Sequence, residues 1–196
     1  RLSRGLRLGV RTGFDSGATL DYVYRNRAEG VTALGRLIDR NYLNAIGWRG
    51  IRLRKAHLEK LLRRAMLDLR AAGRPVHLVD IAAGHGRYVL DAVREHPEIP
   101  ATGLLRDFSD SNVAAGRRLI AEYDLTERFA FEQGDAFDRA SLAALSRAAT
   151  IGIVSGLYEL FPENGPVRAS LAGLAEAVAP GGYLLYTGQP WHPQIE

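Results

Sequence analysis

Cysteine is absent from the sequence, which excludes disulfide bonds and catalysis by a thiolate. No apolar run approaches the roughly 20 residues that a bilayer-spanning helix needs, and the first residues lack the basic-then-apolar pattern of a secretory signal. The five histidines are scattered, and no pair of them lies beside acidic residues at metal-ligand spacing. We therefore expect no membrane span, no metal site and a cytoplasmic location.

Lysine is scarce as well, because Lys55 and Lys60 are the only two in the chain and arginine carries the other positive charges. The charge is also uneven. Residues 1–74 hold 17 Lys and Arg against 6 Asp and Glu, whereas residues 75–196 hold 9 against 16. One interpretation of the basic half is a surface for nucleic acid or anionic lipid. The simpler interpretation, which we prefer, is that arginine is the residue this chain uses where it meets solvent.

Length and composition bound the architecture. A chain of 196 residues, 46% of them hydrophobic, can form one domain with a small extension and can bury a sizeable core. Helical patterns dominate the first part, and strand patterns begin only after Pro75. We therefore predict an N-terminal lead-in and helical cap over residues 1–74 and a sheet-forming domain over residues 75–196.

The helical cap is expected to follow an irregular lead-in over residues 1–18. One helix is predicted over residues 19–27, and a second begins after Thr32, which is a suitable N-cap. Residues 47–50, Gly-Trp-Arg-Gly, interrupt the helical pattern. A third helix then carries an apolar stripe over residues 58–69.

The most informative stretch is a strand, a tight turn and a helix. Residues 76–80 are a short apolar run closed by an acid, which indicates a buried strand. Small residues follow at Ala82, Gly84 and Gly86, and residues 87–93 have helical periodicity. Such a turn brings bare backbone and a helix N-terminus close to a ligand.

The turn does not match the dinucleotide-binding pattern G-x-G-x-x-G, because Val89 stands where the third glycine would be. An NAD-dependent oxidoreductase is therefore disfavoured. The spacing instead resembles D-x-G-x-G-x-G, the first motif of class I S-adenosylmethionine (SAM) methyltransferases. Asp80 is the acid of that motif, and Ala82 replaces its first glycine.

Further strands alternate with helices along the rest of the chain. Strands are predicted over residues 102–107, 129–132, 151–155 and 183–187, with helices between them. This alternation indicates an α/β fold, a Rossmann-like doubly wound parallel sheet with helices on both faces. Ligands bind at the carboxyl ends of such strands.

Acids stand at the ends of three successive strands: Asp80, Asp107 and Asp135. Asp107 could accept hydrogen bonds from both hydroxyls of a ribose. Phe108 could pack against an adenine, and Asp135 could accept from the adenine amino group. The alternative is that Asp107 and Asp135 are helix caps or turn acids.

The resemblance to class I SAM methyltransferases extends from about residue 76 to residue 192. Residues 154–162 (VSGLYELFP) and 186–193 (YTGQPWHP), with residues 20–26 and 46–52, also resemble a bacterial group of proposed methyltransferases. Members of that group are often fused behind an α/β-hydrolase domain, which could therefore be a fused or separate partner here. The resemblance implies no particular substrate.

The resemblance implies SAM as the cofactor and suggests which residues hold it. The methionine part would lie among Asp80, Ala82, Ala83, Gly84, His85 and Gly86, the ribose at Asp107, the adenine among Phe108, Asp135 and Ala136, and the methyl group beside Ser155, Gly156 and Tyr158. From the cap, Tyr24 or Arg25 would meet the SAM carboxylate.

The implied reaction is an in-line attack on a sulfonium methyl group, for which the protein mainly supplies alignment. A base is needed only if the nucleophile carries a proton, and the candidates are His192, Tyr158 and Glu159. The expected acceptor is a small molecule or a lipid-like molecule. Two alternatives stay open: an RNA methyltransferase that uses the basic N-terminal half, and a non-catalytic domain that binds SAM or a partner.

The C-terminal end carries one more expectation. A class I methyltransferase sheet resembles five parallel strands extended by two more, whereas only five strands are predicted here. Residues 183–186 are apolar on both faces, which suits a covered strand better than an exposed edge. We therefore expect the native polypeptide to continue past Glu196, and residues 1–196 alone to associate through this strand.

Overall fold

The computed structural model describes residues 3–145 and 149–188. The chain forms two compact units, Arg1–His57 and Leu58–Glu196, called unit 1 and unit 2 below. The boundary lies inside the long helix α4 (Ile46–Ala71). The expected boundary after residue 74 therefore differs from the observed division, because the second half of α4 belongs to the same compact unit as the sheet.

Unit 1 consists of helices: α1 (Arg4–Thr12), α2 (Gly17–Arg25), α3 (Ala33–Leu43) and the beginning of α4. Each of the first three is capped by a hydroxyl side chain. Ser3 accepts from the amide of Leu6, Ser16 from that of Thr19, and Thr32 from that of Gly35. The cap at Thr32 is confirmed, whereas α2 begins two residues before Thr19.

The prediction of an irregular lead-in was wrong, because residues 4–12 form α1. Its two buried glycines are points of close packing. A Cβ on Gly5 would lie 2.7 Å from ring atoms of Tyr22 and Tyr42, and one on Gly9 would lie 2.3 Å from the ring of Phe14. These glycines look like loop residues in the sequence, but they allow aromatic side chains to approach the helix.

The predicted interruption at residues 47–50 was also wrong, because both glycines lie inside α4. Nothing lies within 4 Å of a Cβ at Gly47 or Gly50, so close packing is not their role. Each costs about 1 kcal/mol relative to alanine in a helix. The helix tolerates this cost because it buries an apolar stripe further along, which consists of Leu58, Leu62, Ala65, Met66 and Leu69.

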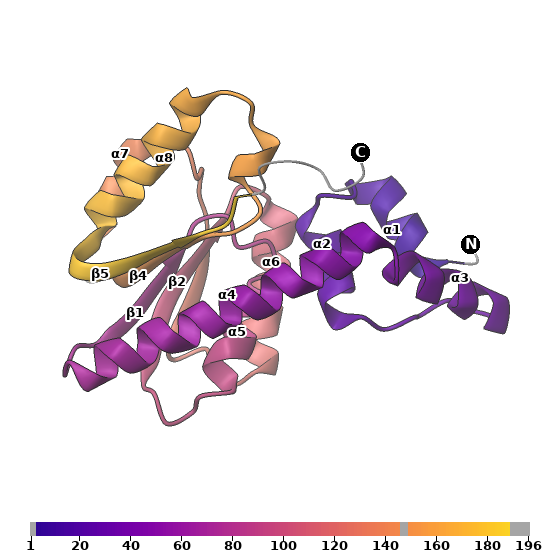
Figure 1. Ribbon diagram of the computed structural model, residues 1–196, viewed down its shortest axis with the longest axis horizontal. Coiled ribbons are helices and arrows are strands. Elements are labelled where there is room, and N and C mark those ends of the chain that lie inside the picture. The colour runs from indigo at the N-terminus through magenta and orange to yellow at the C-terminus, as the bar shows by residue number, and fades with distance from the viewer. Residues whose placement is uncertain (1–2, 146–148, 189–196) are drawn as a thin grey trace. The chain divides into compact units, whose positions relative to one another are not determined.

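Unit 2 is built on a five-stranded parallel sheet with the order β3-β2-β1-β4-β5. The strands are β1 (Val76–Asp80), β2 (Ala101–Asp107), β3 (Phe129–Gln133), β4 (Ala149–Val154) and β5 (Val178–Tyr186). The connecting helices are α5 (Arg87–Arg94), α6 (Asp110–Glu122), α7 (Arg139–Ala143), the 3-10 turn η1 (Tyr158–Leu160) and α8 (Asn164–Ala177). Figure 1 shows α7 and α8 on one face of the sheet and α5 and α6 on the other. The predicted doubly wound α/β fold is confirmed.

The strand order reverses at β1, which lies between β2 and β4. Val76 pairs with Ala101 of β2, and Leu78 pairs with Ile151 of β4. The carboxyl ends of β1, β2 and β4 therefore meet at one edge of the sheet, at the switch point where such folds bind ligands. One part of the core beneath this edge consists of Val79, Ile81, Ala136, Leu142, Ala149, Val154 and Leu174.

β5 is an edge strand of the described sheet and pairs with β4. It begins five residues before the predicted start at residue 183, and its pairing with β4 shifts in register near Ala149. Leu184 and Tyr186 are 37% and 60% exposed. The expected cover over this strand stays a prediction.

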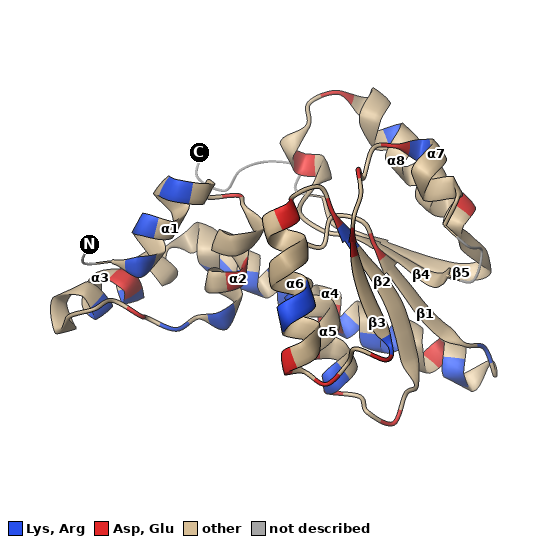
Figure 2. Ribbon diagram, turned by 180° about the vertical axis from the view of Figure 1, so that it is seen from behind, with Lys and Arg blue, Asp and Glu red and all other residues tan. Residues whose placement is uncertain are grey.

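Within the described residues, no helix combines the length and the apolarity that crossing a bilayer would require. Charged residues are distributed differently over the two units. Figure 2 shows mainly basic residues along α1 and α3 of unit 1, and acidic residues at the ends of the strands in unit 2.

Candidate functional site

The turn after β1 is held between its two neighbouring strands. The amide of Ile81 donates to the carbonyl of Ile153 in β4 at 3.2 Å, and the amide of Ala83 donates to that of Arg106 in β2 at 2.9 Å. The turn closes on itself where the amide of Gly86 donates to the carbonyl of Ala83 at 2.7 Å. Its backbone is therefore fixed at the switch point of the sheet.

Two residues of this turn have to be glycine. Gly84 and Gly86 adopt φ angles of +59° and +75°, which L side chains rarely adopt. A Cβ on Gly86 would also lie 2.7 Å from Cδ2 of Leu105. Gly86 is the N-cap of α5 and offers no side chain to its amides. The turn therefore presents bare backbone and an uncapped helix N-terminus, where a ligand's polar groups can approach.

Asp107 at the end of β2 lies beside this turn. Its Oδ2 accepts a hydrogen bond from the amide of Gly84 at 2.8 Å, and its Oδ1 accepts from the amide of Ser109 and from Nδ2 of Asn112, both at 2.9 Å. Each carboxylate oxygen can accept two hydrogen bonds. Oδ2 accepts from one donor only, so it is the oxygen to which a ligand hydroxyl could donate a hydrogen bond.

Asp80, the acid of the motif, lies below the turn and not on its surface. Its side chain is fully buried, and the hydroxyl of Tyr88 donates to its Oδ2 at 2.5 Å. Burial raises the pKa of Asp80 to about 7. In the structure Asp80 supports the turn from inside the core. Its predicted contact with a cofactor stays a prediction.

The ends of β2 and β3 are joined by hydrogen bonds. The amide of Gly134 donates to the carbonyl of Asp107 at 3.0 Å, and Nε2 of Gln133 donates to the carbonyl of Phe108, also at 3.0 Å. Phe108 is 74% exposed. This places an exposed aromatic ring next to the Asp107 carboxylate, an arrangement that suits a ligand with both a flat ring and hydroxyl groups.

Asp135 and Ala136 follow directly on this junction. Oδ1 of Asp135 accepts from the amide of Phe137 at 2.8 Å, so the predicted alternative of a turn acid is realised there. Asp135 is exposed, and its carboxylate can accept further hydrogen bonds. Ala136 is buried in the core, and its side chain therefore contributes packing below the site.

Arg106, in β2, is a buried residue near the site that was not among the predicted site residues. It is 5% exposed, its Nε lies 3.0 Å from Oε1 of Glu132, and its Nη2 donates to Oγ of Ser141 at 2.8 Å. A Cβ on Gly134 would lie 2.4 Å from its guanidinium. Arg106 therefore supports the turn at residues 134–136 from below. The available signal was a charged residue inside an otherwise apolar strand.

Thr187, which was also not among the predicted site residues, joins the ends of β4 and β5 by hydrogen bonds. Its Oγ1 accepts from the amide of Gly156 at 2.9 Å and donates to Oγ of Ser155 at 3.5 Å. Gly156 adopts a φ of +75°. The candidates Ser155 and Gly156 thus lie at the same edge of the sheet as the glycine turn, at the end of β4.

The candidate bases are placed differently. The hydroxyl of Tyr158 is hydrogen-bonded to Oγ of Ser170 in α8 at 2.9 Å, and burial raises its pKa. A phenol that is paired and harder to ionise is a poor base, which favours a packing role, and the catalytic role of Tyr158 stays a prediction. Glu159 follows it in η1 and is partly exposed. His192 lies outside the described residues.

Four further predicted contacts are Ala82, His85, Tyr24 and Arg25. Ala82 and His85 are partly exposed in the glycine turn, at positions that line its surface. Arg25 belongs to unit 1, where its Nε lies 3.1 Å from Oδ2 of Asp21 and its Nη1 lies 2.7 Å from Oε1 of Glu29. The predicted contacts of Arg25 and its neighbour Tyr24 with a cofactor stay predictions. Within residues 3–145 and 149–188, no group of three or more His, Asp or Glu could hold a metal ion.

The chain matches one family model over its whole length. The family is described as "Putative methyltransferase", and residues 1–196 are matched. Among curated proteins, the chain is similar to the "Uncharacterized protein YnbC" of Escherichia coli (strain K12), with 59% identity over 194 residues. The match covers 99% of this chain and 33% of that protein, so the chain spans about a third of the length of this relative.

Solved structures share the fold at low sequence identity. A possible exported protein from Bordetella parapertussis has a TM-score of 0.69 at 17% identity, over 89% of this chain and 55% of that one. An O-methyltransferase family protein from Burkholderia thailandensis has a TM-score of 0.52 at 23% identity, over 76% of this chain and 43% of that one. At these identities the likeness concerns the fold alone.

Proposed function

This chain belongs to the family described as "Putative methyltransferase", and we propose that it is a SAM-dependent methyltransferase whose cofactor lies at the carboxyl ends of β1, β2 and β4. One observation carries the proposal: the carboxylate of Asp107 is hydrogen-bonded to the amide of Gly84 across the glycine turn. This bond brings an acid that can accept hydrogen bonds from hydroxyls next to a bare backbone turn.

The residues at these strand ends fit the parts of SAM. The ribose hydroxyls would donate to Asp107, whose Oδ2 has a single donor. The adenine would lie against the exposed ring of Phe108, with Asp135 as an acceptor for its amino group. The methionine part would lie along the turn from Ala82 to Gly86, where the positive φ angles at Gly84 and Gly86 favour glycine and so leave no side chain to block the cofactor.

SAM supplies an activated methyl group on a positively charged sulfonium. The chain's own residues have to align an acceptor and exclude water. Ser155 and Gly156, tied down by Thr187, would border the acceptor side of the site. If the nucleophile carries a proton, Glu159 or His192 would be the group that removes it, because the hydroxyl of Tyr158 is bonded to Ser170.

We propose a small or lipid-like acceptor. RNA is the second candidate, because residues 1–74 carry 17 basic residues against 6 acidic ones. A fused or separate α/β-hydrolase partner remains a proposal from the family resemblance. The curated relative is about three times as long as this chain, so its activity as a whole does not transfer to residues 1–196.

Titration calorimetry with SAM tests the cofactor site. Asp107→Asn keeps the shape of the side chain but removes the charge that receives the ribose hydroxyls, so SAM affinity should fall by roughly 1.5–3 kcal/mol for each charge-assisted hydrogen bond lost. Asp110→Asn is the matched control, because Asp110 is exposed and lies three residues further along the chain. This variant should bind SAM with the affinity of the native chain. Equal SAM affinity in all three proteins would overturn the assignment of Asp107.

A further inference from the structure

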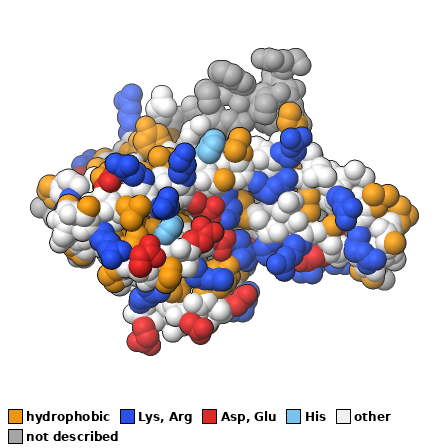
Figure 3. All heavy atoms as spheres, turned by 60° about the horizontal axis from the view of Figure 1, so that its bottom comes forward, with side chains coloured by type: hydrophobic (Ala, Val, Ile, Leu, Met, Phe, Trp, Pro, Cys, Tyr) orange, Lys and Arg blue, Asp and Glu red, His pale blue; other side chains and the backbone are white. Residues whose placement is uncertain are grey.

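Unit 1 has a strongly positive surface. Its residues, 1–57, include 12 Lys and Arg but only four Asp and Glu. Figure 3 shows basic and hydrophobic side chains with little acidic surface over the part of this face that belongs to unit 1. The orientation of the four acids decides how much of this charge is neutralised at the surface.

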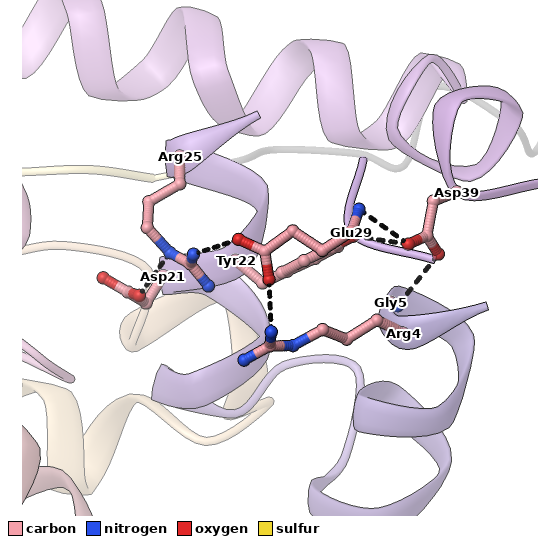
Figure 4. Close-up of polar contacts among 7 residues, drawn as sticks. All are labelled: Arg4, Gly5, Asp21, Tyr22, Arg25, Glu29 and Asp39. Atoms are coloured by element: carbon pink, nitrogen blue, oxygen red, sulfur yellow. Dashed lines mark hydrogen bonds and ion pairs between the residues drawn. The ribbon is translucent and has the colours of Figure 1, made fainter. Parts of the chain in front are cut away.

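Asp39 is directed into the interior of unit 1 (Figure 4). It is fully buried, and its carboxylate accepts from the amide of Gly5 at 3.0 Å, from the amide of Glu29 at 3.1 Å, from the hydroxyl of Tyr22 at 2.8 Å and from the hydroxyl of Ser3. Burial opposes ionisation, but the hydrogen bonds from Ser3 and Gly5 keep the pKa of Asp39 below its ordinary value. Its charge therefore stabilises the packing of α1, α2 and α3.

Two more acids are occupied by neighbouring arginines, as Figure 4 also shows. Asp21 is 8% exposed and lies 3.1 Å from Nε of Arg25. The carboxylate of Glu29 lies 2.7 Å from Nη1 of Arg25 and 2.6 Å from Nη1 of Arg4. Asp15 is then the one acid of residues 3–57 that is exposed and outside this network. The outer surface of unit 1 is left with arginines that no acid balances.

The outer face of α1 combines such arginines with exposed aliphatic side chains. Leu6 and Val10 are 41% and 77% exposed and lie one helical turn apart. Arg7 comes directly after Leu6 and Arg11 directly after Val10, and both arginines are also exposed. Within the described ranges, neither arginine has an ion-pair partner. The buried side of the same helix is formed by Gly5 and Gly9.

The outer face of α3 repeats this combination. Leu34 and Leu37 are 56% and 55% exposed. Arg36 and Arg40 lie one turn apart beside them and are exposed, and neither forms an ion pair with any residue that the structure describes. The opposite side of α3 carries Asp39 and faces the core. Two packed helices of unit 1 thus share one pattern, with pairs of exposed aliphatic residues next to pairs of unbalanced arginines.

We propose that these two outer faces bind an anionic lipid membrane surface. The arginine–aliphatic surface, as we call it, consists of Leu6, Arg7, Val10, Arg11, Leu34, Arg36, Leu37 and Arg40. Guanidinium groups pair with lipid phosphates in a bidentate manner, and aliphatic side chains beside them enter the boundary between headgroups and acyl chains. The proposal goes beyond methyl transfer, and it would bring an acceptor that resides in a membrane close to the protein.

Nucleic acid is the competing occupant, and the side chains between the arginines argue against it. A protein binds the phosphate backbone of a nucleic acid through cationic side chains. Proteins that bind single strands also use aromatic rings, on which the bases stack. The residues between the arginines are leucine and valine, which offer neither charge nor a flat ring. Exposed aliphatic side chains next to arginines are instead typical of interfacial amphipathic helices.

Sedimentation with lipid vesicles tests the proposal on the 196-residue chain. The probes are vesicles of phosphatidylcholine alone, vesicles of phosphatidylcholine with phosphatidylglycerol, and a single-stranded oligoribonucleotide. The charge variant replaces Arg7, Arg11, Arg36 and Arg40 by Ser. The aliphatic variant replaces Leu6, Val10, Leu34 and Leu37 by Ser.

A control variant with the same loss of charge replaces four exposed basic residues of unit 2 by Ser: Lys60, Arg63, Arg118 and Arg168. A second control, Leu61→Ser, changes a leucine of unit 2 that is 53% exposed. All replaced residues are at the surface, and circular dichroism with a thermal melt checks that each variant keeps its fold.

We expect the native chain to bind the vesicles with phosphatidylglycerol and to dissociate as salt rises above the concentration at which the Debye length is about 8 Å. The charge variant should lose about fivefold in affinity for each arginine removed. The aliphatic variant should also lose affinity, whereas both controls should bind as the native chain does.

Three results would overturn the proposal: no preference for the anionic vesicles, an equal loss in the charge variant and its control, or tighter binding to the oligoribonucleotide than to the vesicles. The last would make this an RNA surface. None of these measurements depends on SAM, so failure of the membrane proposal and failure of the proposed methyl transfer can be told apart.

Discussion

The amide of Gly84 donates a hydrogen bond to Oδ2 of Asp107 at 2.8 Å, although 22 residues separate them in the chain. This bond joins the turn after β1 to the end of β2. It can form because β1 and β2 are parallel neighbours, with Asp80 paired to Leu105 at their ends. The geometry of the glycine turn and the orientation of the strand-two acid are therefore coupled.

Replacing Gly86 by alanine should disturb both the glycine turn and the orientation of Asp107. The φ of +75° costs an L residue roughly 1–2 kcal/mol, and the new Cβ would lie 2.7 Å from Leu105. We expect Gly86→Ala to lower the free energy of unfolding by at least that amount and to weaken SAM binding. Chemical denaturation and calorimetry measure the two effects.

Gly50→Ala is the matched control for this substitution. Gly50 lies inside α4, and nothing lies within 4 Å of a Cβ there. Alanine should therefore stabilise the chain by roughly 0.5–1 kcal/mol. If both substitutions changed stability in the same direction, the conformational role assigned to Gly86 would be wrong.

Arg106→Met should destabilise the protein. It removes the hydrogen bond to Ser141 and the contact with Glu132 from a buried position, and we expect a loss of about 1–3 kcal/mol in the free energy of unfolding. Arg139→Met is the control, because its pair with Glu176 is exposed and should contribute about 0.5 kcal/mol. Comparable losses in urea denaturation would contradict the supporting role of Arg106.

Asp80 should make stability depend on pH. Its pKa is about 7 in the folded chain and about 3.9 when unfolded, so the folded state binds this proton more tightly. The Asp80 contribution to stability is therefore fully present below about pH 4 and is lost as pH rises towards 7, by roughly a few kcal/mol.

Denaturation curves of native chain and Asp80→Asn across this pH range measure the contribution. The asparagine cannot ionise and can still accept a hydrogen bond from Tyr88. The stability difference between the two proteins should change steadily from pH 4 to 7, in favour of the asparagine variant as pH rises. A difference that is constant with pH would show that Asp80 does not titrate in this range.

Tyr158→Phe separates a packing role from a catalytic one. Removal of the hydroxyl loses the hydrogen bond to Ser170, so we expect about 1 kcal/mol less stability and an unchanged rate of methyl transfer. Glu159→Gln and His192→Ala are the comparison, since either should lower the rate and leave SAM affinity nearly intact. A large loss of rate in Tyr158→Phe alone would restore Tyr158 as a catalytic residue.

Several parts of the fold depend on local chemistry and could be predicted from the chain's residues. The alternation of apolar runs with helical patterns predicted the five strands and the doubly wound sheet, because burial on both faces leaves a continuous apolar run in each strand. The turn at residues 82–86 was predictable as well, because glycine is the residue that adopts positive φ angles readily, and Gly84 and Gly86 do so in the structure. The strand-two acid followed from the rule that ligands meet the carboxyl ends of parallel strands.

Contacts between residues that are far apart in the chain could not be predicted in this way. Gly5 and Gly9 belong to a helix because aromatic rings pack against them, and α4 continues through Gly47 and Gly50 because its stripe further along is buried. Asp39 looks like an ordinary surface charge in the sequence, and Asp80 and Arg106 are charged residues of strands, yet all three are buried among partners from other elements. The partners of these buried charges come from long-range packing, which sets both the pKa of Asp80 and the surplus of positive charge on the surface of unit 1.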